Sequence, residues 1–145
     1  MTDTLTTAPA SNPLLQPWDT PHGLPPFSRI EPAHFQPAFQ AAMRAHRDEL
    51  EAIAQQAEAP SFDNTVAAFD RAGRLLGRIE SVFYNLTASE TSPALQAVQR
   101  EMAGPLAAHA NSVYMNASLF ARIDASPAAA EPVEEIVGAS FRFKF

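Results

Sequence analysis

Proline spacing limits what the first part of this chain can fold into more than any other feature. More than half of the 13 prolines occur before residue 33: Pro9, Pro13, Pro17, Pro21, Pro25, Pro26 and Pro32. Proline lacks a backbone donor and pushes the preceding residue towards extended geometry, so no regular helix can pass through this region. The sequence therefore predicts a Pro-rich extended arm over residues 1–30.

The arm carries more large apolar side chains than a disordered linker does. They are Leu14, Leu15, Trp18, Leu24, Phe27 and Ile30. We expect these side chains to dock, either on the chain's own helices or on another part of the protein.

A first helix is predicted from about Glu31–Ala33 to about Ala57. Its apolar residues recur at steps of three and four, which places them on one helix face. The stripe comprises Phe35, Phe39, Met43 or Ala42, His46, Leu50, Ile53 and Ala57. Pro37 falls in the first turn, where a missing N–H is tolerated, and Pro60 prevents continuation.

The second predicted helix is one run from the capping oxygens of Ser61, Asp63 and Asn64 to about Ala88. Its apolar stripe comprises Phe62, Val66, Phe69, Leu76, Ile79, Phe83 and Leu86. Gly73 and Gly77 each lower the helix propensity by about 1 kcal/mol. They also remove side chains, so another helix could approach closely there.

Two further helices complete the prediction. Ser92 caps a third helix that begins at Pro93 and carries an apolar stripe, with a kink expected at Gly104-Pro105. Its stripe comprises Leu95, Val98, Met102, Leu106 and Val113. Asn116 caps a short fourth helix through Ile123. Short connections favour antiparallel packing, so we expect an all-α fold of three to four antiparallel helices over residues 31–124.

Residues 125–145 differ from the rest. An Ala- and Pro-rich run over 126–132 is typical of a linker, and 141–145 alternates Phe with basic residues as a strand would. This atypical, linker-like tail is not a usual end for a helical domain.

Composition excludes several classes of protein. There is no cysteine, which removes disulfides and cysteine-ligated zinc. The net charge is −6 and no basic stripe with interleaved aromatics occurs, so nucleic acid is a poor candidate partner. Neither a signal peptide nor a membrane span is visible. We expect a soluble, cytoplasmic protein.

A search for catalytic groups finds none. The histidines are His22, His34, His46 and His109; none is followed by glutamate and no two are four apart, so the zinc motif H-E-x-x-H cannot be written. A histidine on an apolar helix face, such as His46, is more often packed than a ligand. No nucleophile elbow, phosphate loop or dinucleotide motif occurs. The sequence predicts no catalytic, cofactor-binding or metal-binding residue.

An ordered set of short motifs nevertheless resembles one family. The set runs from Asn12-Pro13-Leu14-Leu15 through Trp18-Asp19-Thr20-Pro21, Gly23-Leu24-Pro25-Pro26-Phe27 and Phe35-Gln36-Pro37-Ala38-Phe39 to Ser61-Phe62-Asp63-Asn64-Thr65-Val66, Phe83-Tyr84-Asn85-Leu86 and Leu119-Phe120-Ala121-Arg122-Ile123. It resembles, over residues 12–125, the N-terminal portion of bacterial peptidyl-dipeptidases of the thimet oligopeptidase group, the M3 zinc peptidases.

The resemblance implies an all-helical metallopeptidase much longer than this chain, with a deep channel between two halves. In that family zinc is held by the two histidines of H-E-x-x-H and a later glutamate, and the glutamate within the motif activates the metal-bound water. The dipeptidyl carboxypeptidases of the group release C-terminal dipeptides. None of those positions exists here, and the likeness ends near Ala125.

Three interpretations follow. The first is an N-terminal fragment of a zinc metallopeptidase that forms part of a substrate-channel wall, inactive alone and partnered by the remaining catalytic portion. The second is a free-standing helical interaction module. The third is a non-functional truncated gene product. In each case apolar faces that lack their usual partners would favour self-association.

Overall fold

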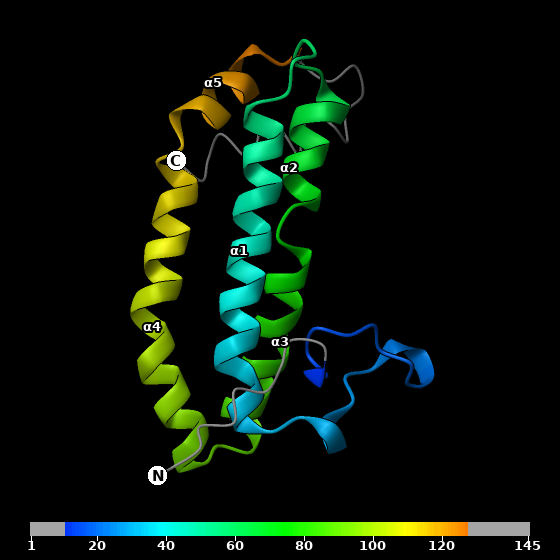
Figure 1. Ribbon diagram of the computed structural model, residues 1–145, viewed down its shortest axis with the longest axis vertical. Coiled ribbons are helices and arrows are strands. Elements are labelled where there is room, and N and C mark those ends of the chain that lie inside the picture. Colours follow the sequence, from blue (N-terminus) through cyan, green and yellow to red (C-terminus); the bar gives the residue numbers. More distant parts are fainter. Residues whose placement is uncertain (1–10, 128–145) are drawn as a thin grey trace. The chain divides into compact units, whose positions relative to one another are not determined.

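The computed structural model describes residues 11–127, which fold into helices and 3-10 turns with no strand in that range. The chain forms two compact units. The first comprises residues 11–45 and 73–107, and the second comprises residues 46–72 and 108–127. Two long helices, α1 (Phe35–Ala54) and α4 (Pro93–Tyr114), contribute residues to both units (Figure 1). The predicted all-α fold is confirmed for the described residues.

Residues 11–34 contain no α-helix, as the prolines of the arm predict. This part of the chain includes the 3-10 turns η2 (Pro21–Gly23), η3 (Phe27–Arg29) and η4 (Pro32–His34). The last of these leads directly into α1, which begins at Phe35 and ends at Ala54, inside the predicted limits at both ends. At that junction the Glu31 N–H donates to Nδ1 of His34, at 3.0 Å.

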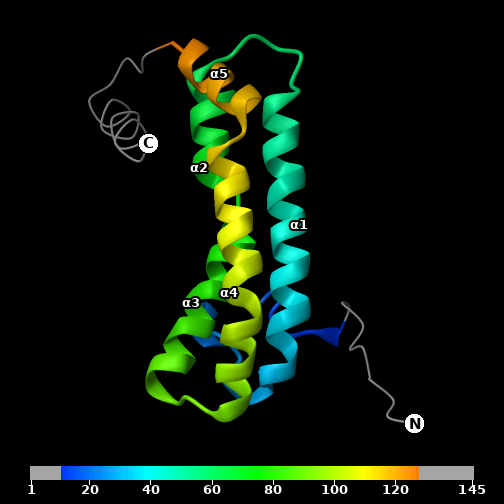
Figure 2. The ribbon, with the colours of Figure 1, turned by 90° about the vertical axis from the view of Figure 1, so that its left-hand side faces the viewer.

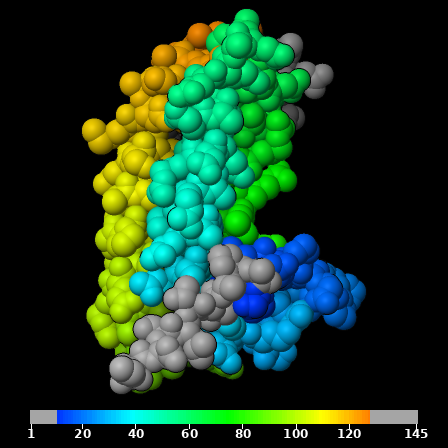
Figure 3. All heavy atoms as spheres, in the orientation of Figure 1, coloured from blue at the N-terminus to red at the C-terminus, as the bar shows by residue number. Residues whose placement is uncertain are grey.

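The arm docks on the chain's own helices. Leu14 is fully buried in the first unit's core, and Leu15, Trp18 and Ile30 pack against it. Leu24 and Phe27 stay 58% and 46% exposed, so docking is confirmed for only part of the predicted set. Figure 3 shows the arm as a lobe beside the beginning of α1.

Arg78 of α3 (Arg74–Ser89) fastens the arm. Its Nη2 donates to the carbonyl oxygens of Leu14, at 2.8 Å, and Gln16, at 3.3 Å. The guanidinium carbon also lies 4.5 Å from the centroid of the Trp18 ring, within cation–π range. One α3 side chain thus binds two carbonyls and an aromatic face of the arm.

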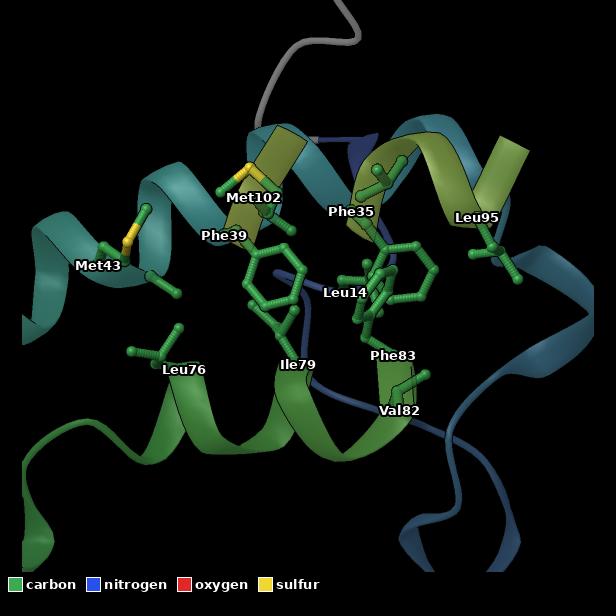
Figure 4. Packing of buried hydrophobic residues seen from close by; sticks show 13 residues of the cluster. Leu14, Phe35, Phe39, Met43, Leu76, Ile79, Val82, Phe83, Leu95 and Met102 are labelled. Atoms are coloured by element: carbon green, nitrogen blue, oxygen red, sulfur yellow. The ribbon is translucent and has the colours of Figure 1, made fainter. Parts of the chain in front are cut away.

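Three phenylalanines form the centre of the first unit's core (Figure 4). Phe83 contacts Phe35 and Phe39 edge-on, with ring centroids 4.9 and 5.3 Å apart. Such pairs add about 0.5–1.5 kcal/mol beyond area burial. The surrounding buried residues are Leu14, Ala38, Ala42, Met43, Leu76, Ile79, Val82, Leu95, Val98 and Met102. Within this unit α3 runs antiparallel to both α1 and α4 (Figures 1 and 2).

The predicted single helix over 61–88 is wrong. The chain forms a π-helical segment, η5 (Phe62–Ala67), then α2 (Ala68–Arg71), and only after a break α3. Gly73 adopts φ 76° and ψ 12°, a left-handed conformation that glycine reaches without steric cost. The apolar stripe is thereby divided: Leu76, Ile79 and Phe83 serve the first unit's core, whereas Phe69 packs in the second.

The second unit has a smaller core of Leu50, Ile53, Val113 and Leu119. Its last helix, α5 (Ala117–Ala125), packs on η5 (Figure 2). The side chain of Asn116 accepts the N–H of Leu119, at 3.0 Å, which confirms the predicted cap.

The remaining helix signals are confirmed in part. Ser92 accepts the N–H of Leu95 at the predicted start of α4, at 3.2 Å. Helix α4 continues through Gly104 and Pro105, and the kink expected there stays a prediction. No helix among residues 11–127 has the length and apolar character needed to cross a membrane. The strand-like tail and its linker from residue 128 onward lie outside the described residues.

Candidate functional site

The structure brings two of the four histidines together. Nδ1 of His46, on α1, lies 2.9 Å from Nε2 of His109, on α4, and the ring centroids are 5.0 Å apart. His109 is only 6% exposed and His46 is partly buried. Both residues belong to the second unit.

Sequence reasoning treated these histidines separately and missed the pair. It placed His46 on the apolar face of its helix, which is correct, and favoured packing over ligation for such a histidine. One feature of the sequence could have suggested the pair, because each histidine lies on the buried apolar stripe of a long helix. His109 is seven residues after Met102 and four before Val113. Nothing local indicated that the two stripes meet at these positions.

Burial lowers the pKa of both imidazoles. For His46 it is the main cause, and the carboxylate of Glu49 opposes it by favouring the charged ring. For His109, burial is again the main cause of the lowered pKa. The positive charges of protonated His46 and of Arg47 lower it further. A pKa below the ordinary value of about 6.5 means that the pair is neutral at pH 7.

The pair does not fit a catalytic metal centre. No group of three or more His, Cys, Asp or Glu side chains in the described part of the chain could hold a metal ion. A metal-bound histidine almost always donates its other ring N–H to an acceptor. Nδ1 of His109 is buried and has no hydrogen-bond partner among residues 11–127. We assign no metal ligand and derive no catalytic step from these residues.

A second buried polar cluster surrounds Arg122 of α5. Its guanidinium donates to Thr65 Oγ1, at 3.1 Å, to the backbone and side-chain oxygens of Gln56, at 3.0 and 2.8 Å, and to the carbonyl of Glu58, at 2.7 Å. A longer contact, of 3.4 Å, reaches Oδ1 of Asn64. Every acceptor is a neutral oxygen, so this buried cation is held by hydrogen bonds rather than by a carboxylate.

The Arg122 cluster joins two of the motifs that are far apart in sequence. Asn64 and Thr65 belong to the motif at the start of η5, where Ser61 Oγ accepts the Asn64 N–H at 3.1 Å and Asn64 Oδ1 accepts the Ser61 N–H at 2.9 Å. Arg122 belongs to the motif in α5, 57 residues after Thr65. The cluster therefore fixes the start of η5 against α5 and is structural.

A shallow pocket also lies in the first unit. It encloses about 200 Å³ and is lined by Ser11, Pro13, Gln16, Pro17, Pro26, Arg29 and His34. Arg29 pairs with Asp19, at 2.7 Å, and Nδ1 of His34 accepts the Glu31 N–H.

Comparison with known proteins identifies the relatives of this chain. It is 42% identical over 116 residues to a dipeptidyl carboxypeptidase of Salmonella typhimurium, and 40% identical over 114 residues to that of Escherichia coli. These matches cover 80% and 79% of the chain. The chain is homologous to the M3 peptidases. Oligopeptidase A of Escherichia coli is a weaker relative, at 34% identity over 59% of the chain.

The homology covers only part of these M3 peptidases. The matched segment spans 17% of the length of each dipeptidyl carboxypeptidase and 12% of oligopeptidase A. It corresponds to the N-terminal portion, as the order of motifs predicted. No family model matches the chain.

Proposed function

We propose that this chain is the N-terminal helical part of a metallopeptidase that releases C-terminal dipeptides from oligopeptides, and that it forms part of the substrate-channel wall. The observation that carries the proposal is the 42% identity to a dipeptidyl carboxypeptidase over 80% of the chain but only 17% of that relative. Peptide hydrolysis would then need the remaining catalytic portion, with its zinc, and short peptides would be the substrates.

The packing of the chain supports a structural role. Its polar clusters at Arg78 and Arg122 bind backbone carbonyls and fix an arm and a helix junction. A wall element needs this kind of rigidity because it must keep its shape while substrates pass. A cytoplasmic location is part of the same proposal.

The first experiment tests the isolated chain. Purified protein is incubated with a chromogenic oligopeptide and added zinc, and dipeptide release is followed by mass spectrometry. We expect no turnover, because no described residue group could hold the metal. Robust turnover that a chelator abolishes would overturn the proposal.

The second experiment tests the structural role directly. Escherichia coli dipeptidyl carboxypeptidase is truncated to remove the segment that aligns with this chain, and the chain is then added in trans. We expect recovery of part of the dipeptide-release activity, and a smaller recovery with Phe83→Ala, which empties the aromatic core of the first unit. Failure of the wild-type chain to bind the truncated enzyme would favour the free-standing interaction module or the non-functional product.

A further inference from the structure

The proton positions in the histidine pair follow from its surroundings. One ring must donate and the other accept, and the choice depends on the tautomers. If His46 Nδ1 donated, neutral His109 would carry its proton on the buried Nδ1, leaving an N–H without an acceptor among residues 11–127. The opposite choice leaves only a ring lone pair at that nitrogen. Either orphaned group costs about 1–3 kcal/mol, but a buried N–H without an acceptor is the rarer of the two in proteins. We therefore assign the donor to His109 Nε2 and the acceptor to His46 Nδ1.

This arrangement resists the first added proton by either route. A proton on His109 has to go to its buried Nδ1, where the charge is desolvated and Arg47 repels it. A proton on His46 Nδ1 would face the His109 N–H across 2.9 Å, unless His109 moved its own proton to the orphaned site. A second proton would place two imidazolium rings in contact.

We propose that the His46–His109 hydrogen bond is a pH-dependent latch, which holds the second half of α1 to the last part of α4 within the second unit at neutral pH and opens in acid. The charged groups that act on the pair are Arg47, which favours opening, and Glu49, which attracts a proton to His46 and partly offsets the repulsion. The latch is independent of the proposed peptidase role.

The direction of the effect is set by linkage. A histidine whose folded pKa lies below its unfolded value stabilises the closed state fully above about pH 6.5, and that stabilisation is lost as the pH falls. For each proton that the pair takes up on opening, the equilibrium constant between the closed and open states changes by up to tenfold per pH unit.

The test is amide hydrogen exchange of the 145-residue chain between pH 7.5 and 5.0, corrected for intrinsic exchange rates. We expect protection over residues 46–54 and 109–114 to fall several-fold across this range, while residues 79–83 in the first unit keep theirs. His46→Gln should weaken the pH dependence, because its amide can accept the His109 N–H and does not titrate, whereas the buried His109 still does. Unchanged protection in the wild-type chain would overturn the latch, as would the same pH dependence in His46→Gln.

His22→Asn is the matched control, because His22 is exposed and at φ 60°, a conformation that Asn tolerates. It should keep the wild-type pH dependence; loss of that dependence would contradict the proposal. Histidine ring NMR titration of the wild type gives an answer even if His46→Gln fails to fold. His46 and His109 should then titrate below the ordinary histidine value of about 6.5, and midpoints at that value for both rings would overturn the latch.

Discussion

At the scale of single residues, Arg122 is notable because its guanidinium alone makes five hydrogen bonds. A buried guanidinium without a carboxylate must satisfy its charge through hydrogen bonds, and here the oxygens of Gln56, Glu58, Asn64 and Thr65 provide them. Hydrogen bonds to charged groups contribute about 1.5–3 kcal/mol each, although they are not additive.

Replacing Arg122 should therefore destabilise the fold strongly. We expect Arg122→Met to lower the free energy of unfolding by about 3 kcal/mol, because the buried Thr65 hydroxyl and several part-buried oxygens lose their donor. Urea denaturation followed by circular dichroism measures the change. Arg100→Met, at an exposed position of α4, should alter the value by less than about 0.5 kcal/mol. Equal unfolding midpoints for the two variants would contradict the role assigned to Arg122.

Glu80 gives a second residue-scale prediction, on pH. Partial burial raises the pKa of this carboxyl, so its ionised form destabilises the folded state above that pKa. Glu80→Gln should stabilise the chain at pH 7 by at most about 1 kcal/mol, since solvent screens a half-exposed group. The gain should vanish as the pH falls below about 4, where Glu80 is protonated in both states. Thermal unfolding from pH 7 to 3.5 follows it, and a gain that persists at low pH would contradict the explanation.

At the scale of elements, one glycine decides how the second apolar stripe is used. Periodicity predicted a continuous helix because Phe62, Phe69, Leu76 and Phe83 repeat at heptad spacing. The left-handed backbone at Gly73 ends that run and begins α3. The helix propensity of glycine lowers the expected helicity equally at Gly73 and Gly77. It could not show that the helix breaks at Gly73, since Gly77 stays inside α3.

The two glycines should respond oppositely to the same substitution. Gly73→Ala forces a Cβ into φ 76°, which costs about 1–2 kcal/mol of stability. Gly77→Ala lies within α3, and an added Cβ meets nothing within 4 Å, so it should stabilise by about 0.5–1 kcal/mol. Differential scanning calorimetry of both variants tests this. If Gly73→Ala is as stable as Gly77→Ala, the break at Gly73 is not required by the fold.

At the scale of the whole molecule, several large apolar side chains of the described residues are exposed to solvent. Leu24 and Phe27 on the arm are about half exposed, and Met115, between α4 and α5, is 83% exposed. Exposed apolar groups of this kind favour association when their usual partner is missing.

The chain should therefore self-associate in a concentration-dependent way. Sedimentation velocity over a range from about 5 to 500 µM should show a rising mean mass. The double variant Leu24→Ser and Phe27→Ser should shift that rise to higher concentration without changing the helical circular dichroism signal. A compact monomer across the whole range would show that these side chains do not drive association.

The sequence alone determined the features that depend on neighbours along the chain. The prolines exclude an α-helix between residues 11 and 34, Ser92 and Asn116 cap helices where expected, and the order of short motifs identified the M3 relatives. These features could be inferred because their energies depend on a few consecutive residues. The order of the motifs also predicted that the chain matches the N-terminal portion of these relatives.

Only the tertiary structure decided which side chains meet across long separations. It paired His46 with His109 across 63 residues and bound Arg122 to oxygens 57 or more residues earlier. It also distributed one apolar stripe between two cores. A helical period fixes which face of a helix is apolar, but the partner of that face depends on loop conformation and packing. Those are settled by the free energy of the whole fold, not by local sequence.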